Sequence, residues 1–79
     1  MQVILYTGPH CRLCHDAEQL LYQAGLSASQ ITKVDITTSL ELKKRYGLSI
    51  PVVQNQESEA ELFWPFDLEG LVRFLEKEL

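Results

Sequence analysis

The sequence predicts a single α/β domain in which a four-stranded mixed sheet is flanked by three helices. Two observations indicate this class. Short apolar runs typical of strands alternate with stretches whose apolar residues recur at helical spacing, and the segments follow the order β-α-β-α-β-β-α. A crossover through a helix makes the first two strands parallel, whereas a tight hairpin makes the last two antiparallel. The length of 79 residues accommodates one domain, residues 1–79, with a minimal core.

The first strand and the first helix meet around the two cysteines. Val3–Tyr6 is rich in β-branched and aromatic residues and runs directly into Thr7-Gly8-Pro9, which predicts a strand followed by a turn. Beyond this turn the spacing becomes helical until Gly25, a residue that commonly ends a helix. We expect Cys11 to lie at the amino end of this helix. Its apolar stripe comprises Leu13, Ala17, Leu20, Leu21 and Ala24.

The middle of the chain predicts a second strand and a short helix. Ile31–Ile36 has the composition of a strand. Thr38-Ser39-Leu40-Glu41 has the form of a capping box, in which the threonine hydroxyl and the glutamate carboxylate each accept a hydrogen bond from a free backbone N–H group. We therefore expect a helix that begins here, continues to Tyr46 and ends at Gly47. The basic run Lys43-Lys44-Arg45 would lie on the solvated end of this helix.

The last third of the chain predicts a hairpin and a final helix. Val52-Val53 is the third strand, Gln54–Glu59 is a polar turn, and Glu61–Trp64 is the fourth strand. Asp67 is the candidate N-cap of the helix that follows, and Phe66 is placed to contact the first turns of that helix. The apolar stripe of the final helix comprises Leu68, Leu71, Val72, Leu75 and Leu79.

Composition and charge exclude several functional classes. The net charge is −4, and the only basic cluster is Lys43–Arg45, whereas nucleic-acid binding requires a dense basic surface. No apolar stretch approaches the length that spans a membrane, and the first residues lack the features of a secretion signal. We therefore expect a cytoplasmic monomer that binds neither nucleic acid nor membranes.

The segment His10–His15, HCRLCH, admits three interpretations. C-x-x-C-H matches a covalent c-type haem site, but haem attachment implies export and usually a second axial ligand, and the only methionine is Met1. A structural zinc site needs four converging ligands, and no cysteine or histidine follows residue 15. No metal ligand is therefore assigned. A metal bound across a dimer, or a bridged iron–sulfur cluster, remains as an alternative to the third interpretation, a redox dithiol.

The redox interpretation uses the positions of the cysteines directly. At the amino end of a helix, free N–H groups and the helix dipole favour an anion, so we expect the pKa of the Cys11 thiol to be lowered. Reactive cysteines in C-x-x-C motifs have pKa values of about 3.5–7.5, compared with about 8.5 for a free thiol. Cys14 lies one turn further along the same face and can resolve a mixed disulfide on Cys11. His10 and His15, if protonated, and Arg12 would add positive charge; otherwise the histidines are exposed polar residues.

Three segments resemble known relatives of this kind. VILYTGPHCRLC, residues 3–14, resembles the first strand and active-site turn of glutaredoxins, and residues 46–51, YGLSIP, resemble the segment that leads to their cis-proline. Leu62–Asp67 matches the L-x-W-P-F-D segment of small bacterial glutaredoxin-like domains. The resemblance covers essentially the whole chain and implies a thioredoxin-like fold. It further implies that Ile50-Pro51 is a cis peptide beside the cysteines, with the Ile50 backbone free to pair with a substrate strand. We take His10, Ile50 and Pro51 as candidate substrate-binding residues.

Two departures from glutaredoxins concern glutathione. Gly8 occupies the position of a lysine that is a partner for the glutathione carboxylate, and Trp64-Pro65-Phe66 replaces a Gly-Gly turn that lets glutathione approach. Both changes remove expected glutathione contacts; we expect Trp64 itself to belong to the core.

The predicted function is that of a thiol-disulfide oxidoreductase, with Cys11 and Cys14 as catalytic residues and disulfides of proteins or small molecules as substrates. We expect no tightly bound cofactor, assign no cofactor-binding residue, and take glutathione as a candidate reductant. Two alternatives stay open. One is a binding or adaptor module without turnover that uses Trp64, Phe66 and the cysteine turn as a recognition surface, and the other is a metal or iron–sulfur carrier.

Overall fold

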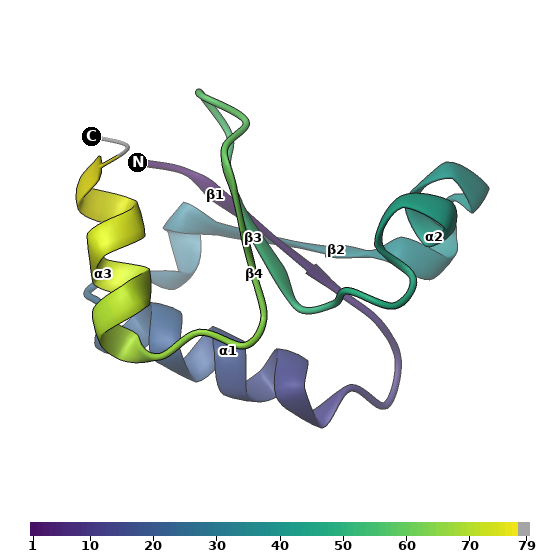
Figure 1. Cartoon of the computed structure of the whole chain (residues 1–79), viewed down its shortest axis with the longest axis horizontal. Coiled ribbons are helices and arrows are strands. Elements are labelled where there is room, and N and C mark those ends of the chain that lie inside the picture. Colours follow the sequence, from purple (N-terminus) through teal and green to yellow (C-terminus); the bar gives the residue numbers. More distant parts are fainter. Residues whose placement is uncertain (78–79) are drawn as a thin grey trace.

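The computed structural model describes residues 1–77, and in this range the predicted order of strands and helices is confirmed (Figure 1). Leu79, which we placed in the last apolar stripe, lies outside the described residues. Two short 3₁₀ turns, Ala28–Gln30 and Ile36–Thr38, flank the second strand. The elements are β1 (Val3–Thr7), α1 (Arg12–Gln23), β2 (Ile31–Asp35), α2 (Leu40–Tyr46), β3 (Val52–Asn55), β4 (Glu61–Phe63) and α3 (Leu68–Lys77).

The four strands form one mixed sheet in the order β2-β1-β3-β4. As predicted, β1 and β2 are parallel and β3 and β4 are antiparallel; β1 also pairs with β3 in antiparallel fashion. Val52, at the start of β3, lies opposite Tyr6 near the end of β1 and opposite Phe63 at the end of β4. The chain segments that follow β1 and β4 and the segment that precedes β3 therefore emerge at the same end of the sheet.

Helices cover both faces of the sheet unequally. Helices α1 and α3 lie together against one face, whereas the short α2 packs near one end of the other face (Figure 1). Because strand residues alternate between faces, neighbouring residues of β1 enter different cores. The larger core contains Val3, Leu5, Ala17, Leu21, Val53, Leu71 and Leu75. The smaller core contains Tyr6, Ile36, Tyr46 and Val52.

Helix α1 ends where the glycine signal predicts. Gly25 has a φ of +101°, a conformation that side chains with a Cβ atom rarely adopt. This turn lets the Leu26 N–H group donate to the Leu21 carbonyl oxygen over 3.2 Å and the Gly25 N–H group donate to the Tyr22 carbonyl oxygen over 3.0 Å. These two bonds form a Schellman motif, which satisfies carbonyl groups at the end of the helix.

The side of α1 that faces the core differs from the predicted stripe by one position. Leu13 is 46% exposed, and Cys14, Ala17 and Leu21 are the buried residues of the helix. The prediction for Leu13 was wrong because Cys14, one residue later, takes the inward position and turns Leu13 toward solvent. When cysteine is counted as a small apolar residue, the sequence pattern predicts the observed buried face of α1.

The cap of α2 is also shifted by one residue. Ser39, not Thr38, is the N-cap, because its hydroxyl oxygen accepts a hydrogen bond from the Leu42 N–H group over 3.3 Å. Thr38 belongs to the preceding 3₁₀ turn, where its hydroxyl donates to the Asp35 carbonyl oxygen over 2.7 Å. The helix nevertheless ends at Tyr46 with Gly47 as its C-cap, as predicted.

Four strand boundaries differ from the sequence prediction. Strand β1 extends one residue further, to Thr7, which pairs with Asp35 of β2. Strand β2 stops at Asp35, whose side chain accepts a hydrogen bond from the Thr37 N–H group and so starts the 3₁₀ turn at Ile36. Strand β3 continues through Asn55, because Gln54 pairs with neighbours on both sides and its polar side chain lies on the less covered face. Trp64 lies just beyond β4.

The final helix begins as predicted at Asp67. Its carboxylate accepts a hydrogen bond from the Gly70 N–H group over 2.8 Å, and its carbonyl oxygen accepts one from the Leu71 N–H group over 2.9 Å. Phe66 packs against the larger core, of which Leu71 is part. These local bonds explain why the start of α3 is readable from the sequence.

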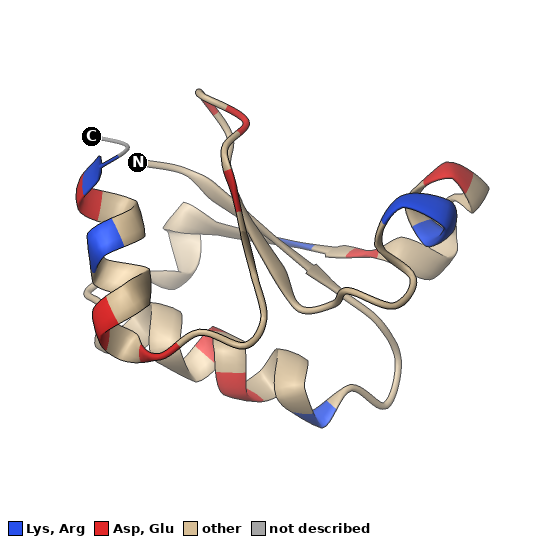
Figure 2. Cartoon of the chain, in the orientation of Figure 1, with Lys and Arg blue, Asp and Glu red and all other residues tan. Residues whose placement is uncertain are grey.

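Charged residues are spread over the surface, with a basic group on α2 (Figure 2). Lys43, Lys44 and Arg45 are all exposed in the last turn of this helix, as expected for a solvated helix end that favours cations. Among residues 1–77, no helix has both the length and the apolar character needed to cross a membrane.

Candidate active site

Three segments meet at the end of the sheet where β1 and β4 stop and β3 begins. They are residues 8–11 after β1, residues 47–51 before β3, and residues 64–67 after β4. A Cβ atom added to Gly8 would lie only 2.8 Å from Ile50 Cδ1, so the first two segments are in tight contact. The Trp64 N–H group donates to the Pro51 carbonyl oxygen over 3.2 Å, which links the second segment to the third.

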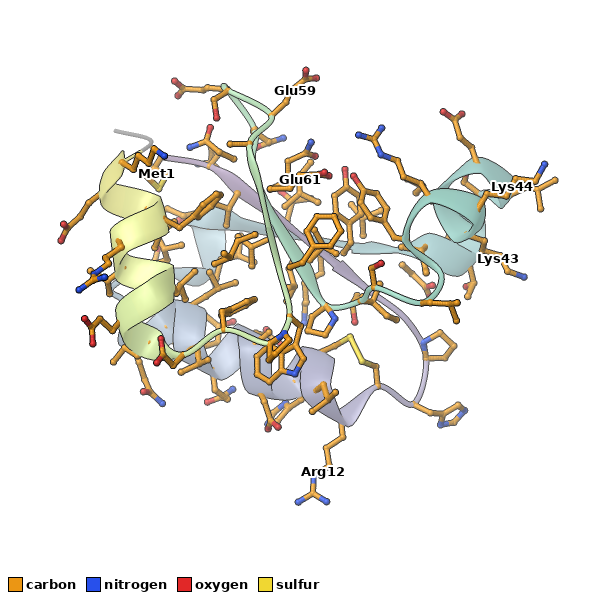
Figure 3. All side chains as sticks on the ribbon, viewed as in Figure 1. Met1, Arg12, Lys43, Lys44, Glu59 and Glu61 are labelled. Atoms are coloured by element: carbon orange, nitrogen blue, oxygen red, sulfur yellow. A yellow bond between two sulfur atoms is a disulfide. The ribbon has the colours of Figure 1, made fainter. Side chains whose placement is uncertain are left out.

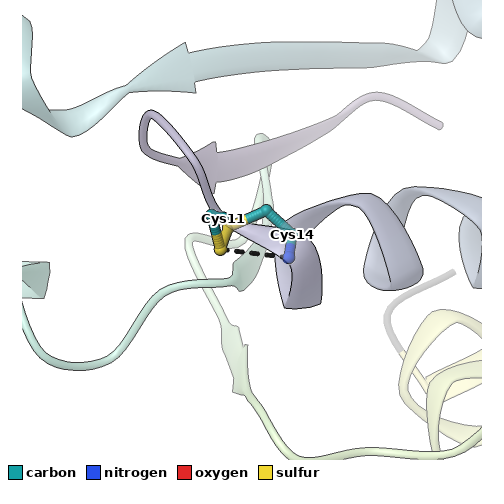
Figure 4. Close-up of a disulfide and its surroundings, with 2 residues drawn as sticks. All are labelled: Cys11 and Cys14. Carbon is teal, nitrogen blue, oxygen red and sulfur yellow. Dashed lines mark hydrogen bonds between the residues drawn. A yellow bond between two sulfur atoms is a disulfide. The ribbon is translucent and has the colours of Figure 1, made fainter.

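Cys11 and Cys14 lie within this convergence and are joined by a disulfide (Figures 3 and 4). Their Cα atoms are 5.2 Å apart. Cys11 is the N-cap residue of α1, and its Sγ atom accepts a hydrogen bond from the Cys14 N–H group over 3.1 Å, the dashed line in Figure 4. The Cys11 sulfur thus occupies the position in which the oxygen of a serine or aspartate usually caps a helix.

The two sulfur-bearing residues differ in accessibility. Cys14 is 4% exposed and packs inside the domain, whereas Cys11 is only half-buried. An external molecule can therefore reach Cys11 more readily than Cys14. The predicted roles, attack by Cys11 and resolution by Cys14, require this order of accessibility.

The polar neighbours of the cysteines are all exposed. His10, in the left-handed region with a φ of 58°, and His15 both lie on the surface on either side of the cysteine pair. Arg12 extends away from the disulfide into solvent (Figure 3). Its charge is therefore screened by water and adds little to the stabilisation of a thiolate. Residues 1–77 contain no group of three or more His, Cys, Asp or Glu side chains arranged to hold a metal ion.

The proline segments frame the disulfide. Pro51 is fully buried, and the Ile50–Pro51 peptide bond is cis, as the resemblance implied. The Trp64–Pro65 bond is also cis, which the sequence reasoning did not anticipate. Trp64 is partly buried against the larger core, and its ring meets that of Phe66 edge-on with a centroid distance of 4.9 Å. The expectation that Trp64 contributes to the core is met.

Sequence reasoning missed a partly buried polar contact between α2 and β4. Tyr46 is 1% exposed, its ring stacks on that of Tyr6 with a centroid distance of 4.3 Å, and its hydroxyl donates to the Glu61 carboxylate. Burial, together with the hydrogen bond to Glu61, raises the pKa of Tyr46 well above its ordinary value. The available signal was its position, because Tyr46 directly precedes the segment that leads to the cis-proline.

A C-x-x-C disulfide at the start of the helix after the central parallel strand, with a cis-proline segment packed against the turn that precedes this helix, defines a protein of the thioredoxin-like class. The model of the glutaredoxin-like domain family (DUF836) matches residues 2–76. The chain therefore belongs to the glutaredoxin-like domain family, and the resemblance inferred from the sequence is confirmed.

Solved structures agree with this assignment. The chain is 35% identical in sequence to protein XcR50 from X. campestris, and its TM-score against the X-ray structure of that protein is 0.86. The alignment covers 95% of this chain and 96% of XcR50. The solution structure of the same protein has a TM-score of 0.85, with 98% of this chain and 95% of that chain covered. Thioredoxin 1 from Thermosipho africanus, 12% identical over 99% of this chain and 93% of its own, has a TM-score of 0.64 and shares the fold. The curated proteins contain no match to the chain.

Proposed function

We propose that this protein is a thiol-disulfide oxidoreductase in which Cys11 is the attacking thiol and Cys14 the resolving thiol. The observation that carries the proposal is the placement of the Cys11 sulfur: half-exposed, at the N-cap of α1, and bonded to a buried Cys14. The alternative assignment, with Cys14 as the attacking thiol, would require a substrate to reach a sulfur that is 4% exposed.

The proposed reaction begins with the reduced dithiol. The Cys11 thiolate attacks one sulfur of a substrate disulfide, forms a mixed disulfide and expels the other substrate sulfur as a thiolate, which takes up a proton. Cys14 then loses its proton and attacks Cys11 Sγ, which restores the Cys11–Cys14 disulfide and releases the second substrate thiol. The substrate disulfide gains two electrons and two protons, and the two cysteines lose them.

The helix supplies the electrostatic help for the first step. On reduction, the N–H group that now donates to Cys11 Sγ would donate to a thiolate, and hydrogen bonds to charged acceptors are about twice as strong as neutral ones. The positive end of the α1 dipole acts in the same direction. Both effects lower the pKa of the reduced Cys11 thiol and increase the fraction that is present as the nucleophile.

The resting disulfide must be reduced by an external thiol, and glutathione is our candidate. Glutathione would have to bind here through other contacts than in glutaredoxins. The methyl end of Ile50 fills the space next to Gly8, and Trp64 and Phe66 occupy the third segment. As substrates we propose disulfides of proteins or of small molecules that can reach the half-exposed Cys11. The cycle needs no bound cofactor, because the reduced Cys11–Cys14 dithiol itself carries both electrons, and it suits a reducing compartment such as the cytoplasm.

Two assays on the purified protein test the proposal. Reduction of insulin by dithiothreitol reports on protein disulfides, and reduction of hydroxyethyl disulfide by glutathione reports on the glutathione route. We expect Cys11→Ser to abolish turnover and Cys14→Ser to retain alkylation at Cys11 while accumulating a mixed disulfide with the substrate. The matched pair of serine variants assigns the roles. A Cys14→Ser protein that traps nothing, or a wild-type protein inactive in both assays with its thiols reduced, would favour the adaptor alternative.

A further inference from the structure

The three segments around the disulfide all begin close to one side chain outside the site, that of Tyr46. Tyr46 is itself the last residue of α2, immediately before residues 47–51. Its ring stacks on Tyr6, two positions before Gly8, and its hydroxyl donates to Glu61, three positions before Trp64. One buried side chain thus contacts, or belongs to, each of the three elements from which these segments emerge: β1, α2 and β4.

The contacts of Tyr46 leave it little freedom. The ring is 1% exposed, and the Arg45 guanidinium lies over it at 5.4 Å from the ring centroid. Its carbonyl oxygen accepts a hydrogen bond from the Ser49 N–H group over 2.8 Å, which fixes the first turn of the 47–51 segment. The Tyr6 hydroxyl in turn donates to Gln54 Oε1 over 2.7 Å, so the stacked pair is tied to β3 as well.

We propose that Tyr46, through its hydrogen bond to Glu61, is a positioning residue for thiol-disulfide exchange: it sets the spacing between the proline segment and the cysteine turn in which a substrate disulfide must fit. This inference rests on the proposed function. Tyr46 is not a catalytic residue, because it acts through Ile50 and Pro51.

The site tolerates little displacement. Any Cβ atom at Gly8 would already be 2.8 Å from Ile50 Cδ1, and Pro51 is held to the third segment by the hydrogen bond from Trp64. Without the bond to Glu61, α2 loses its polar link to β4, and residues 47–51 can shift relative to Cys11. A misplacement of about 1 Å is enough to reduce the rate of a positioned reaction up to about 100-fold.

The chain offers a matched set of variants. Tyr46→Phe removes the hydroxyl and keeps the stacked ring, and Glu61→Ala removes the acceptor. Glu61→Gln retains an oxygen that can accept the bond. Tyr22→Phe is the control, because the Tyr22 hydroxyl also donates to a glutamate, Glu18, over 2.9 Å, but on the exposed side of α1.

Insulin reduction under steady-state conditions supplies the readout, together with the pH profile of Cys11 alkylation by iodoacetamide. We expect Tyr46→Phe and Glu61→Ala each to lower kcat by roughly fivefold with KM nearly unchanged, the pattern of reacting sulfurs held in a less productive geometry. The double variant should be no worse than either single variant, since both remove the same bond. Glu61→Gln and Tyr22→Phe should behave like the wild type, and the alkylation profile should be unchanged in all of them.

Several results would overturn this inference. One is a kcat within twofold of the wild type in both Tyr46→Phe and Glu61→Ala, even if their melting temperatures fall, because that pattern indicates a purely structural bond. Additive effects in the double variant, or unfolding of both single variants at 25 °C, would do the same. If only Tyr46→Phe fails to fold, the comparison of Glu61→Ala with Glu61→Gln decides the matter. A wild-type protein without turnover refutes the proposed function instead, so the two failures are distinguishable.

Discussion

The contact between Gly8 and Ile50 yields a prediction that links packing to the site. In Gly8→Ala the new methyl carbon would lie 2.8 Å from Ile50 Cδ1, whereas ordinary contacts start at 3.4 Å. Ile50 Cδ1 must therefore retreat by at least about 0.6 Å. Because Ile50 precedes the cis-proline and contacts the turn before Cys11, this movement occurs where the proline segment and the cysteine turn meet.

The size of the effect follows from which atom must move. Overpacking costs typically about 1–3 kcal/mol, and the displaced atom here is the end of a flexible side chain, so the lower end applies. We expect Gly8→Ala to destabilise the protein by about 1 kcal/mol, a decrease in melting temperature of about 4–8 °C for a domain of this size. Ile50→Val removes the obstructing methyl group and alone costs about 0.5–1.5 kcal/mol.

A double-mutant cycle measured by urea unfolding tests this reasoning. In the Ile50→Val background, Gly8→Ala should cost almost nothing, which gives a coupling of about 1 kcal/mol. Ile31→Val is the control, because Ile31 is also partly buried but pairs with Val3 at the opposite end of β1. Additive effects of Gly8→Ala and Ile50→Val would refute the account, as would equal coupling to Ile31→Val.

Two further predictions concern the helix cap and alkaline pH. Asp67→Ala removes the acceptor for the Gly70 N–H group and should cost about 1 kcal/mol in thermal unfolding. Asp67→Asn should largely retain that stability, and an equal loss in both variants contradicts the capping role. Burial and the bond to Glu61 raise the pKa of Tyr46 above its ordinary value of 10.0. Its stabilising effect is therefore complete below pH 10 and is lost as the pH rises toward the folded-state pKa. The melting temperature should fall in this range, and less steeply in Tyr46→Phe; equal slopes would contradict the assignment.

Much of the fold was readable because it depends on short-range interactions. The hydrogen bonds of the Gly25 turn and of the Asp67 cap join groups no more than five positions apart, so the residue types at these positions predict both features. The one-residue errors at Thr38 and Leu13 have the same origin. Each lies next to a residue that serves equally well by local criteria, Ser39 or Cys14, and the packing chose between them.

The chemistry of the site was also local, but its surroundings were not. Cys11 at the start of a helix follows from the turn before it and the helical spacing after it, and the family resemblance supplied the cis-proline. The deeper position of Cys14 and the outward direction of Arg12 became visible only when the helix was seated on the sheet. The accessibility of a thiol depends on what packs against it, which no local pattern encodes.

By itself, then, the sequence determined the order of strands and helices and the position of a C-x-x-C dithiol, a redox-type motif, at the start of a helix. Each of these features depends on residues that are neighbours along the chain. Tertiary structure alone decided that Ile50 closes the space above Gly8 and that the Tyr46 hydroxyl reaches Glu61, 15 positions away. Such contacts depend on the register of β1, β3 and β4. Register is set by all the side chains of the sheet together, so it appears only in the folded domain.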